Sequence, residues 1–329
     1  MGTFTRTTVG TSRRRTLLGS TVVVAAAATV SLAAWPGVAN SSGGGQGGRG
    51  GETGGRGGTV LVASMNGANE VPVPGGPAVG DKDGRALESV EVKGDRVSVT
   101  VKWRGTGRPT ALHIHQGDKG ANGGVEVDFT GLLKKRGGNS VTGTVRVDDA
   151  ALLARLTADP HRFYANLHTA EFPGGAVRGQ LNRVGTDVDF RDAPAAFQAS
   201  VVRGKQIYAC EKAGDGSGTY AFAQRDVRAV LGGGIAHRFT APGSGTPQWV
   251  APDRSGVSAR LISKTPNGAG NIPELALRAR QFGGRGGLLS ATAEILRLNT
   301  VGGVQPARDC TPGETVAVPY RADYVFLRR

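Results

Sequence analysis

The chain has 329 residues, a formal net charge of +14 and two cysteines, which allows two domains but excludes a disulfide-dense scaffold. Aromatic residues make up 5% of the sequence, so a base-stacking surface for nucleic acid is not expected. Positive charge is scattered, and after the first 39 residues Lys134, Lys135 and Arg136 form the only run of three cations. This distribution is typical of a soluble surface that attracts anionic polymers, and no nucleic-acid partner is predicted.

Residues 1–39 have the features of an export signal. Three successive arginines precede the apolar run TLLGSTVVVAAAATVSLAA, and the small residues Gly37 and Ala39 suit a cleavage site. The run is short and diluted by Ser, Thr and Gly, so no transmembrane segment is expected in the mature chain. SRRRTLL resembles a twin-arginine signal with Leu17 at the usual aromatic position, and ordinary secretion is the alternative. Removing this segment takes away four arginines and no acidic residue, which lowers the net charge from +14 to +10.

Residues 40–58, NSSGGGQGGRGGETGGRGG, are too rich in glycine to bury apolar area and predict a disordered linker. Short alternating runs then predict strands between residues 59 and 183. These runs are TVLVASM, SVEVKGDRVSVTVKW, TALHIH, GVEVDF, SVTGTVRV, RFYANLHT and AVRGQL. The dipeptide Gly94-Asp95 inside the second run indicates a hairpin.

The sequence DDAALLARL contains the one credible helix of this region. Asp148 or Asp149 is a suitable N-cap, and Pro160 lies beyond the end as a stop. Many short strands with a single helix predict an all-β sandwich or barrel over residues 59–183.

A second β domain is predicted over residues 196–329, after a polar, acidic linker at residues 184–195. Its expected strands are KQIYACEK, GTYAFAQ, AHRFT, PQWVA, SARLISKT, LALRARQF, LLSATAEILRLNT and ADYVFL. Cys210 and Cys310 lie in this part, and an even cysteine count in an exported chain suggests one disulfide. A metal or redox site with two cysteines is the alternative, but the sequence offers no nearby partners for one.

Three of the five histidines lie on two predicted strands. In ALHIH, strand alternation sends His113 and His115 to the same face, where two imidazoles can converge on one copper or zinc ion. His168 in ANLHT is a candidate third ligand if its strand lies beside the first. Ile114 and Leu167 face away from the histidines, so the registers of the two strands are compatible.

A polar cluster without metal is the alternative, with the imidazoles bonded to backbone carbonyls or to Glu70. Glu70 in NEVPVP is a candidate partner that fixes an imidazole tautomer, or it caps a turn or lies in solvent. Asp118 and Asp128 are more typical of turns. His161 is expected in a solvated loop, and His237, alone in the second half, is expected to be structural. No G-x-S-x-G elbow, phosphate-binding loop or dinucleotide fingerprint occurs, so no catalytic residue is assigned.

Three motifs follow one another between about residues 59 and 182: NGANEVPVP, then ALHIHQG with GANGGVEVDF, then FYANLHTAEFPGGAVRGQL. Together they resemble the CHRD domain, the module named for chordin and also found in exported bacterial proteins. The resemblance implies an immunoglobulin-like β-barrel or sandwich. In chordin such domains belong to an extracellular binding protein, so the resemblance names a module and no reaction.

The second half resembles a bacterial family of unknown function over about residues 203–329. The resemblance rests on GKQIYACEK, AHRF, PQWVAPDRSGVSARL, GGLLSATAEILRLNTVGGVQPARDC and VPYRADYVF. Members of that family commonly have one cysteine in each of the two places seen here, which supports a Cys210–Cys310 disulfide. The His-x-His strand is also similar to that of copper-zinc superoxide dismutases, but the long zinc loop of that family is absent.

The sequence therefore predicts a secreted or cell-envelope protein of two all-β domains that acts as a non-enzymatic extracellular binding module. Its most concrete chemistry is a copper or zinc site at His113, His115 and His168. The alternative is a cell-surface or structural interaction protein without metal, which binds anionic cell-wall polymers or an extracellular protein. A superoxide dismutase-like metalloenzyme is a third hypothesis, and it rests only on the His-x-His resemblance.

Overall fold

The computed structural model describes Met1 and residues 57–135, 137–185, 188–214 and 218–329. The predicted signal peptide, apart from Met1, and nearly all of the predicted Gly-rich linker lie outside the described residues. Within these ranges, no helix has both the length and the apolar character needed to cross a membrane.

The first domain is a curved sheet of nine strands in which β1, from the start of the domain, pairs with β8 and β9 from its end. The sheet order is β5-β4-β7-β8-β1-β2-β3-β6, and every pairing between neighbours is antiparallel. The strands are β1 (Thr59–Asn66), β2 (Arg85–Lys93), β3 (Arg96–Arg104), β4 (Pro109–Gln116), β5 (Val125–Asp128), β6 (Ser140–Arg146), β7 (Phe163–Thr169), β8 (Val177–Gln180) and β9 (Asn182–Arg183).

The predicted hairpin joins β2 to β3. Lys93 pairs with Arg96, which leaves Gly94 and Asp95 as a two-residue loop. Gly94 has a φ of 60°, and a positive φ at the first loop position is the geometry of a type II′ turn, which favours glycine there. The order Gly-Asp is therefore the order that this turn requires.

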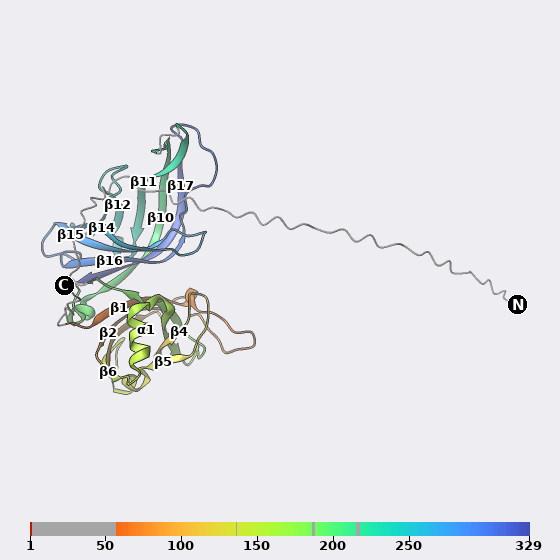
Figure 1. Cartoon of the computed structure of the whole chain (residues 1–329), viewed down its shortest axis with the longest axis vertical. Coiled ribbons are helices and arrows are strands. Elements are labelled where there is room, and N and C mark those ends of the chain that lie inside the picture. Colours follow the sequence, from red (N-terminus) through yellow and green to blue (C-terminus); the bar gives the residue numbers. More distant parts are fainter. Residues whose placement is uncertain (2–56, 136, 186–187, 215–217) are drawn as a thin grey trace, which may run out of the picture. The chain divides into compact units, whose positions relative to one another are not determined.

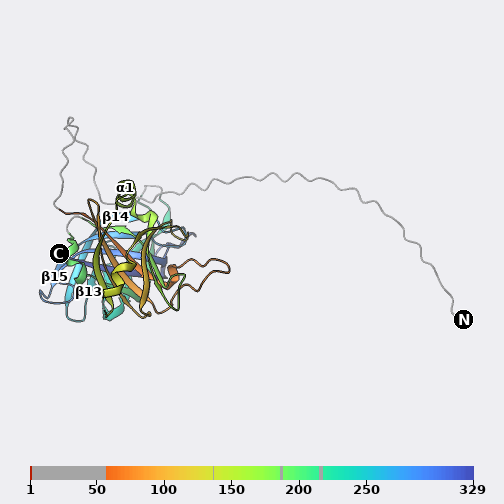
Figure 2. The ribbon, with the colours of Figure 1, turned by 90° about the horizontal axis from the view of Figure 1, so that it is seen from below.

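The predicted helix is α1 (Ala150–Ala158), and the Asp149 side chain caps it by accepting a hydrogen bond from the Leu152 backbone N–H. The helix lies outside the strands of the sheet (Figures 1 and 2). It packs Leu152, Leu153 and Leu156 into the core of the domain. Short 3-10 helices lie at η1 (Gly67–Asn69), η2 (Thr130–Lys135), η3 (Pro160–Arg162), η4 (Phe190–Ala195) and η5 (Gly232–Gly234).

Strand alternation in β4 and β7 gives the sheet an apolar inner face and a polar outer face. Leu112 and Ile114 of β4 and Ala165 and Leu167 of β7 are fully buried in the core. Side chains alternate along each strand, so His113 and His115 of β4 and His168 of β7 lie on the opposite face. This is the orientation that the sequence predicts.

The second domain is a closed antiparallel barrel of eight strands, β10 to β17, in chain order (Figure 1). The strands are β10 (Phe197–Lys212), β11 (Tyr220–Leu231), β12 (Ala236–Phe239), β13 (Pro247–Val250), β14 (Ser255–Thr265), β15 (Glu274–Gly283), β16 (Thr292–Gly302) and β17 (Thr315–Arg328). The prediction of two barrel-like β domains with one short α-helix is confirmed.

Aromatic rings fill the interior of this barrel. Trp249, Tyr324 and Phe326 are almost completely buried. His237 stacks on Trp249 with ring centroids 4.4 Å apart, and its Nδ1 donates to the Gln248 carbonyl. Burial lowers the pKa of His237 to about 3, so the ring is neutral and packs as a core residue, in agreement with its predicted structural role.

The disulfide between Cys210 and Cys310 is present, with the two Cα atoms 5.7 Å apart. It joins β10 to the segment between β16 and β17, which contains no strand or helix. Cys210 packs with Tyr208 and Phe222 in a small apolar cluster of its own. The bridge therefore fixes a long connection that few apolar contacts hold.

A further apolar cluster contains side chains from both β domains. Val60, Val62 and Leu87 contribute from the first, and Leu296 and Val325 are among the contributors from the second. The outward faces of β1 and β17 are therefore apolar where they enter this cluster, which hides the alternation expected for strands with one solvated face.

Candidate metal centre

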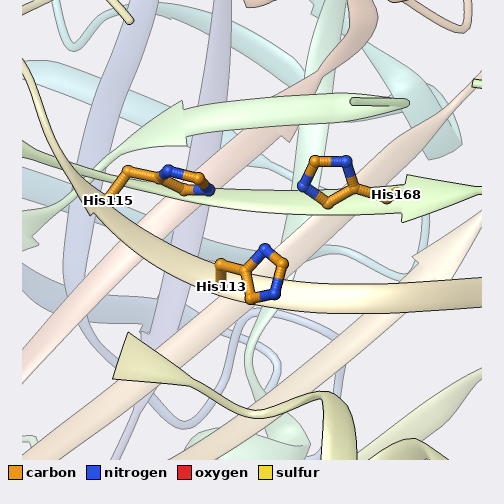
Figure 3. Close-up of side chains that lie close together, drawn as sticks. All are labelled: His113, His115 and His168. Carbon is orange, nitrogen blue, oxygen red and sulfur yellow. The ribbon is translucent and has the colours of Figure 1, made fainter. Parts of the chain in front are cut away.

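The three histidines of the outer face come together because β4 and β7 are antiparallel neighbours. In this register Ala111 lies opposite His168, and Tyr164 lies opposite His115. One ring nitrogen from each of His113, His115 and His168 lies within 4.8 Å of the others. Each ring turns a nitrogen toward the space between them (Figure 3). Within the described part of the chain, this is the one such group of three or more His, Cys, Asp or Glu side chains.

Backbone carbonyls fix the tautomers of two of the rings. His115 Nδ1 lies 3.1 Å from the Gly123 carbonyl oxygen, and His168 Nδ1 lies 3.0 Å from that of Pro173. Since a carbonyl oxygen can only accept, Nδ1 donates in both contacts. In the neutral ring each Nε2 is then left with a free lone pair.

His113 is oriented by side chains of β5 and of the turn that follows it. Its Nε2 lies 3.4 Å from Asp128 Oδ1 and 3.2 Å from Thr130 Oγ1, and Asp128 pairs with His113 across the two strands. The nearby Asp128 carboxylate favours the tautomer that is protonated at Nε2, which leaves the lone pair on Nδ1. The sequence assigned Asp128 to a turn, and its place opposite His113 depends on the β4–β5 register.

The three remaining ring nitrogens are buried and unpaired. His113 Nδ1, His115 Nε2 and His168 Nε2 have no hydrogen-bond partner among the described residues. Leaving a buried polar atom unpaired costs about 1–3 kcal/mol, so a cluster that served packing alone would carry this cost three times. Three imidazole lone pairs in one place are instead the donor set that zinc and copper accept.

Burial also keeps the three imidazoles in the protonation state that a metal site requires. Desolvation lowers the pKa of His115 to about 4, and it is the largest cause of the lowered pKa values of His113 and His168. The three imidazoles are therefore neutral at neutral pH. Neutral imidazole is the ligand form, because a protonated ring has no lone pair to donate.

A stack of three side chains supports the cluster from one side. The Tyr164 ring lies parallel to that of His115, with centroids 4.8 Å apart and an interplanar angle of 2°. The Arg178 guanidinium lies over the Tyr164 ring, with its central carbon 3.5 Å from the centroid of that ring. Arg178 is 1% exposed and donates to Asn122 Oδ1, so it also holds the loop that supplies the Gly123 carbonyl. Sequence reasoning did not identify Tyr164 or Arg178, because nothing local shows which side chains stack.

Glu70, the sequence-based candidate for an imidazole partner, accepts hydrogen bonds from Asn166 of β7. Both of its carboxylate oxygens lie 3.0 Å from Asn166 Nδ2, and no bond from Glu70 to an imidazole is found among the described residues. The side chain lies over Gly175, where an added Cβ would come within 2.6 Å of Oε2. Burial raises the pKa of Glu70 to about 7. The rings take their partners from carbonyls and from β5 instead.

Comparison with known protein families gives two matches. Residues 61–181 match the CHRD domain, which includes every member of the histidine cluster. Residues 230–328 match a family described as a protein of unknown function, DUF3455. No curated protein and no solved structure matches the chain. Both family resemblances predicted from the sequence are confirmed.

Proposed function

We propose that this chain, which carries a CHRD domain followed by a DUF3455 domain, is an exported, non-enzymatic binding module that holds one copper or zinc ion. The ligands are His113, His115 and His168. The observation that carries the proposal is the convergence of three buried ring nitrogens without hydrogen-bond partners. Three protein ligands leave a further coordination position for water or for a ligand from outside.

The Cys210–Cys310 disulfide supports the exported location. Disulfides form and persist in oxidising surroundings and are rare in reducing ones. The arginine-led apolar segment at the start of the chain supports the same location. The proposed setting is therefore outside the cell or in the cell envelope, where the module would hold its metal.

We expect metal-free protein to bind one copper or zinc ion per chain, as measured by calorimetric titration and by elemental analysis after gel filtration. His113→Ala should weaken this binding by more than about 100-fold, because loss of a ligand costs more than loss of a residue that only orients one. The matched control is His161→Ala, the same change in η3, outside the cluster. Equal affinities in the two variants, or no metal on the unsubstituted chain, would overturn the proposal.

Tyr164→Leu should weaken metal binding by about tenfold, because His115 loses the ring that holds its plane. Tyr164→Phe keeps the stack and loses only the hydroxyl that accepts from the Gly123 N–H, so it should retain most of the affinity. The same titration compares the two variants. An unchanged affinity in Tyr164→Leu would show that the stack does not orient His115.

A further inference from the structure

Four cations lie close together on three adjacent strands of the second domain. β11 and β17 both pair with β10, one on each side (Figure 1). Lys205 of β10 is directly opposite Arg228 of β11 on one side and Pro319 of β17 on the other. Arg203 lies two residues before Lys205 on β10, and Arg321 lies two residues after Pro319 on the antiparallel β17, so both lie on the same side of this row. We call Arg203, Lys205, Arg228 and Arg321 the basic strand face.

The basic strand face lies on the outside of the barrel. The neighbours Gln206, Val227 and Tyr320 are 1%, 2% and 3% exposed and turn inward. By alternation the four cations point outward, and all four are exposed. Neighbouring strands are about 4.8 Å apart, and alternate residues along a strand about 6.8 Å, so the charges are close neighbours.

Carboxylates compensate the charge of this face only in part. Asp323 lies two residues after Arg321 on the same face of β17, and its oxygens accept from Ser64, Ser200 and Asn299. Arg203, Lys205 and Arg321 make no ion pair with any described residue. Arg228 Nε lies 3.8 Å from Asp226 Oδ2, and the other oxygen of Asp226 accepts from two backbone N–H groups. Like charges directly opposite each other on a sheet are unfavourable, so an anion from outside would relieve the repulsion between Lys205 and Arg228.

We infer that the basic strand face binds a linear phosphate polymer. Three of the four cations are arginines, whose planar forks match the oxygens of phosphate. The exposed neighbours Val202, Pro319 and Val301 are not aromatic, so the face offers no aromatic ring on which a nucleic-acid base could stack. The partner is therefore a flexible phosphate chain without bases. This surface belongs to the second domain, and the inference is independent of the proposed metal site.

The test measures binding of the whole chain to immobilised long-chain inorganic polyphosphate at low and moderate salt. The test variant replaces the four cations of the basic strand face by glutamine. The control variant removes the same charge from exposed positions on strands β12, β14 and β15 of the same barrel: Arg238→Gln, Arg260→Gln, Lys264→Gln and Arg280→Gln. Melting temperatures of both variants are recorded, and that of the test variant should be unchanged or raised, because a repulsive pair is removed.

We expect the test variant to bind at least about tenfold more weakly and with a smaller salt dependence, because each lost contact removes a charge that displaces counterions. The control should stay within about twofold of the unsubstituted chain. Equal losses of affinity in both variants would show that binding depends only on the net charge of the chain, and would overturn the inference. No binding by the unsubstituted chain would overturn it too, as would tighter binding to single-stranded DNA or equal binding to polyglutamate.

Discussion

Between pH 5 and pH 8 the first domain should lose about 3 to 4 kcal/mol less unfolding free energy in Glu88→Gln than in the unsubstituted chain. Glu88 is fully buried on β2, and neither carboxylate oxygen has a hydrogen-bond partner among the described residues. It lies opposite Ala63 and Val101, which are core residues. Burial raises its pKa from 4.5 to about 8, because water solvates the ionised form and the aliphatic core does not.

The sign follows from proton uptake. The folded state keeps the Glu88 proton up to about pH 8, whereas the unfolded chain loses it near pH 4.5. The stabilising contribution is therefore complete below pH 4.5 and is lost as the pH rises through that interval to about 8. Between pH 5 and pH 8 the expected loss of unfolding free energy is about 3 to 4 kcal/mol.

Urea denaturation of the two proteins at pH 5 and pH 8 measures this loss. The difference between the two pH values should be smaller in Glu88→Gln than in the unsubstituted chain by about 3 to 4 kcal/mol. Glu91→Gln makes the same chemical change on the same strand at a partly exposed position and should leave the difference unchanged. Glu70, whose pKa is raised to about 7, leaves a pH dependence in both proteins. The same difference between pH 5 and pH 8 in Glu88→Gln as in the unsubstituted chain would show that the buried carboxyl of Glu88 does not titrate as described.

Replacing Cys210 and Cys310 by alanine should lower the free energy of unfolding of the second domain by up to about 4.7 kcal/mol. The bridge closes a loop of 100 residues, and the chain-entropy model gives about this value for a loop of that length. Apart from the bridge, the connection that carries Cys310 is held by backbone hydrogen bonds of Gly313 and Glu314 to Cys210 and by Arg308, which lies over the Phe222 ring. These contacts remain in the variant, so the value is an upper limit.

Guanidinium denaturation of the oxidised chain, the reduced chain and the double-alanine variant measures this effect. Reduction should destabilise the unsubstituted chain about as much as the double substitution does. A reducing agent should have no effect on the variant, which makes the variant its own control. A loss of less than about 1 kcal/mol would mean that the unfolded chain gains little freedom when the bridge is removed.

Local patterns in the sequence are enough to predict much of this fold. The Asp149 cap and the Gly94-Asp95 turn follow from rules that act over a few residues, and the structure confirms both. Alternation in β4 also predicts that His113 and His115 share one face. The convergence with His168 depends on the β4–β7 register, which joins strands about 50 residues apart and which no local pattern determines.

Glu88 shows where alternation fails as a guide. The sequence predicts a strand that begins at Ser89, whereas β2 begins at Arg85. Ala86 packs into the core of the first domain, and Leu87 packs into the apolar cluster that contains side chains from both domains. Both faces of the strand are therefore apolar where it starts. The sequence pattern does not show which face Glu88, the next residue, lies on, and so it does not predict that the carboxyl is buried.

The histidine cluster is built on the side of the sheet that does not form the core. The three histidines can therefore be exchanged without a change in the residues that fold the domain, such as Leu112, Ile114 and Leu167. The residues of the proposed site and the residues of the core are therefore different positions of the same two strands. The same framework could take a different ligand set, in evolution or by design, through substitutions at a few outward positions of β4 and β7.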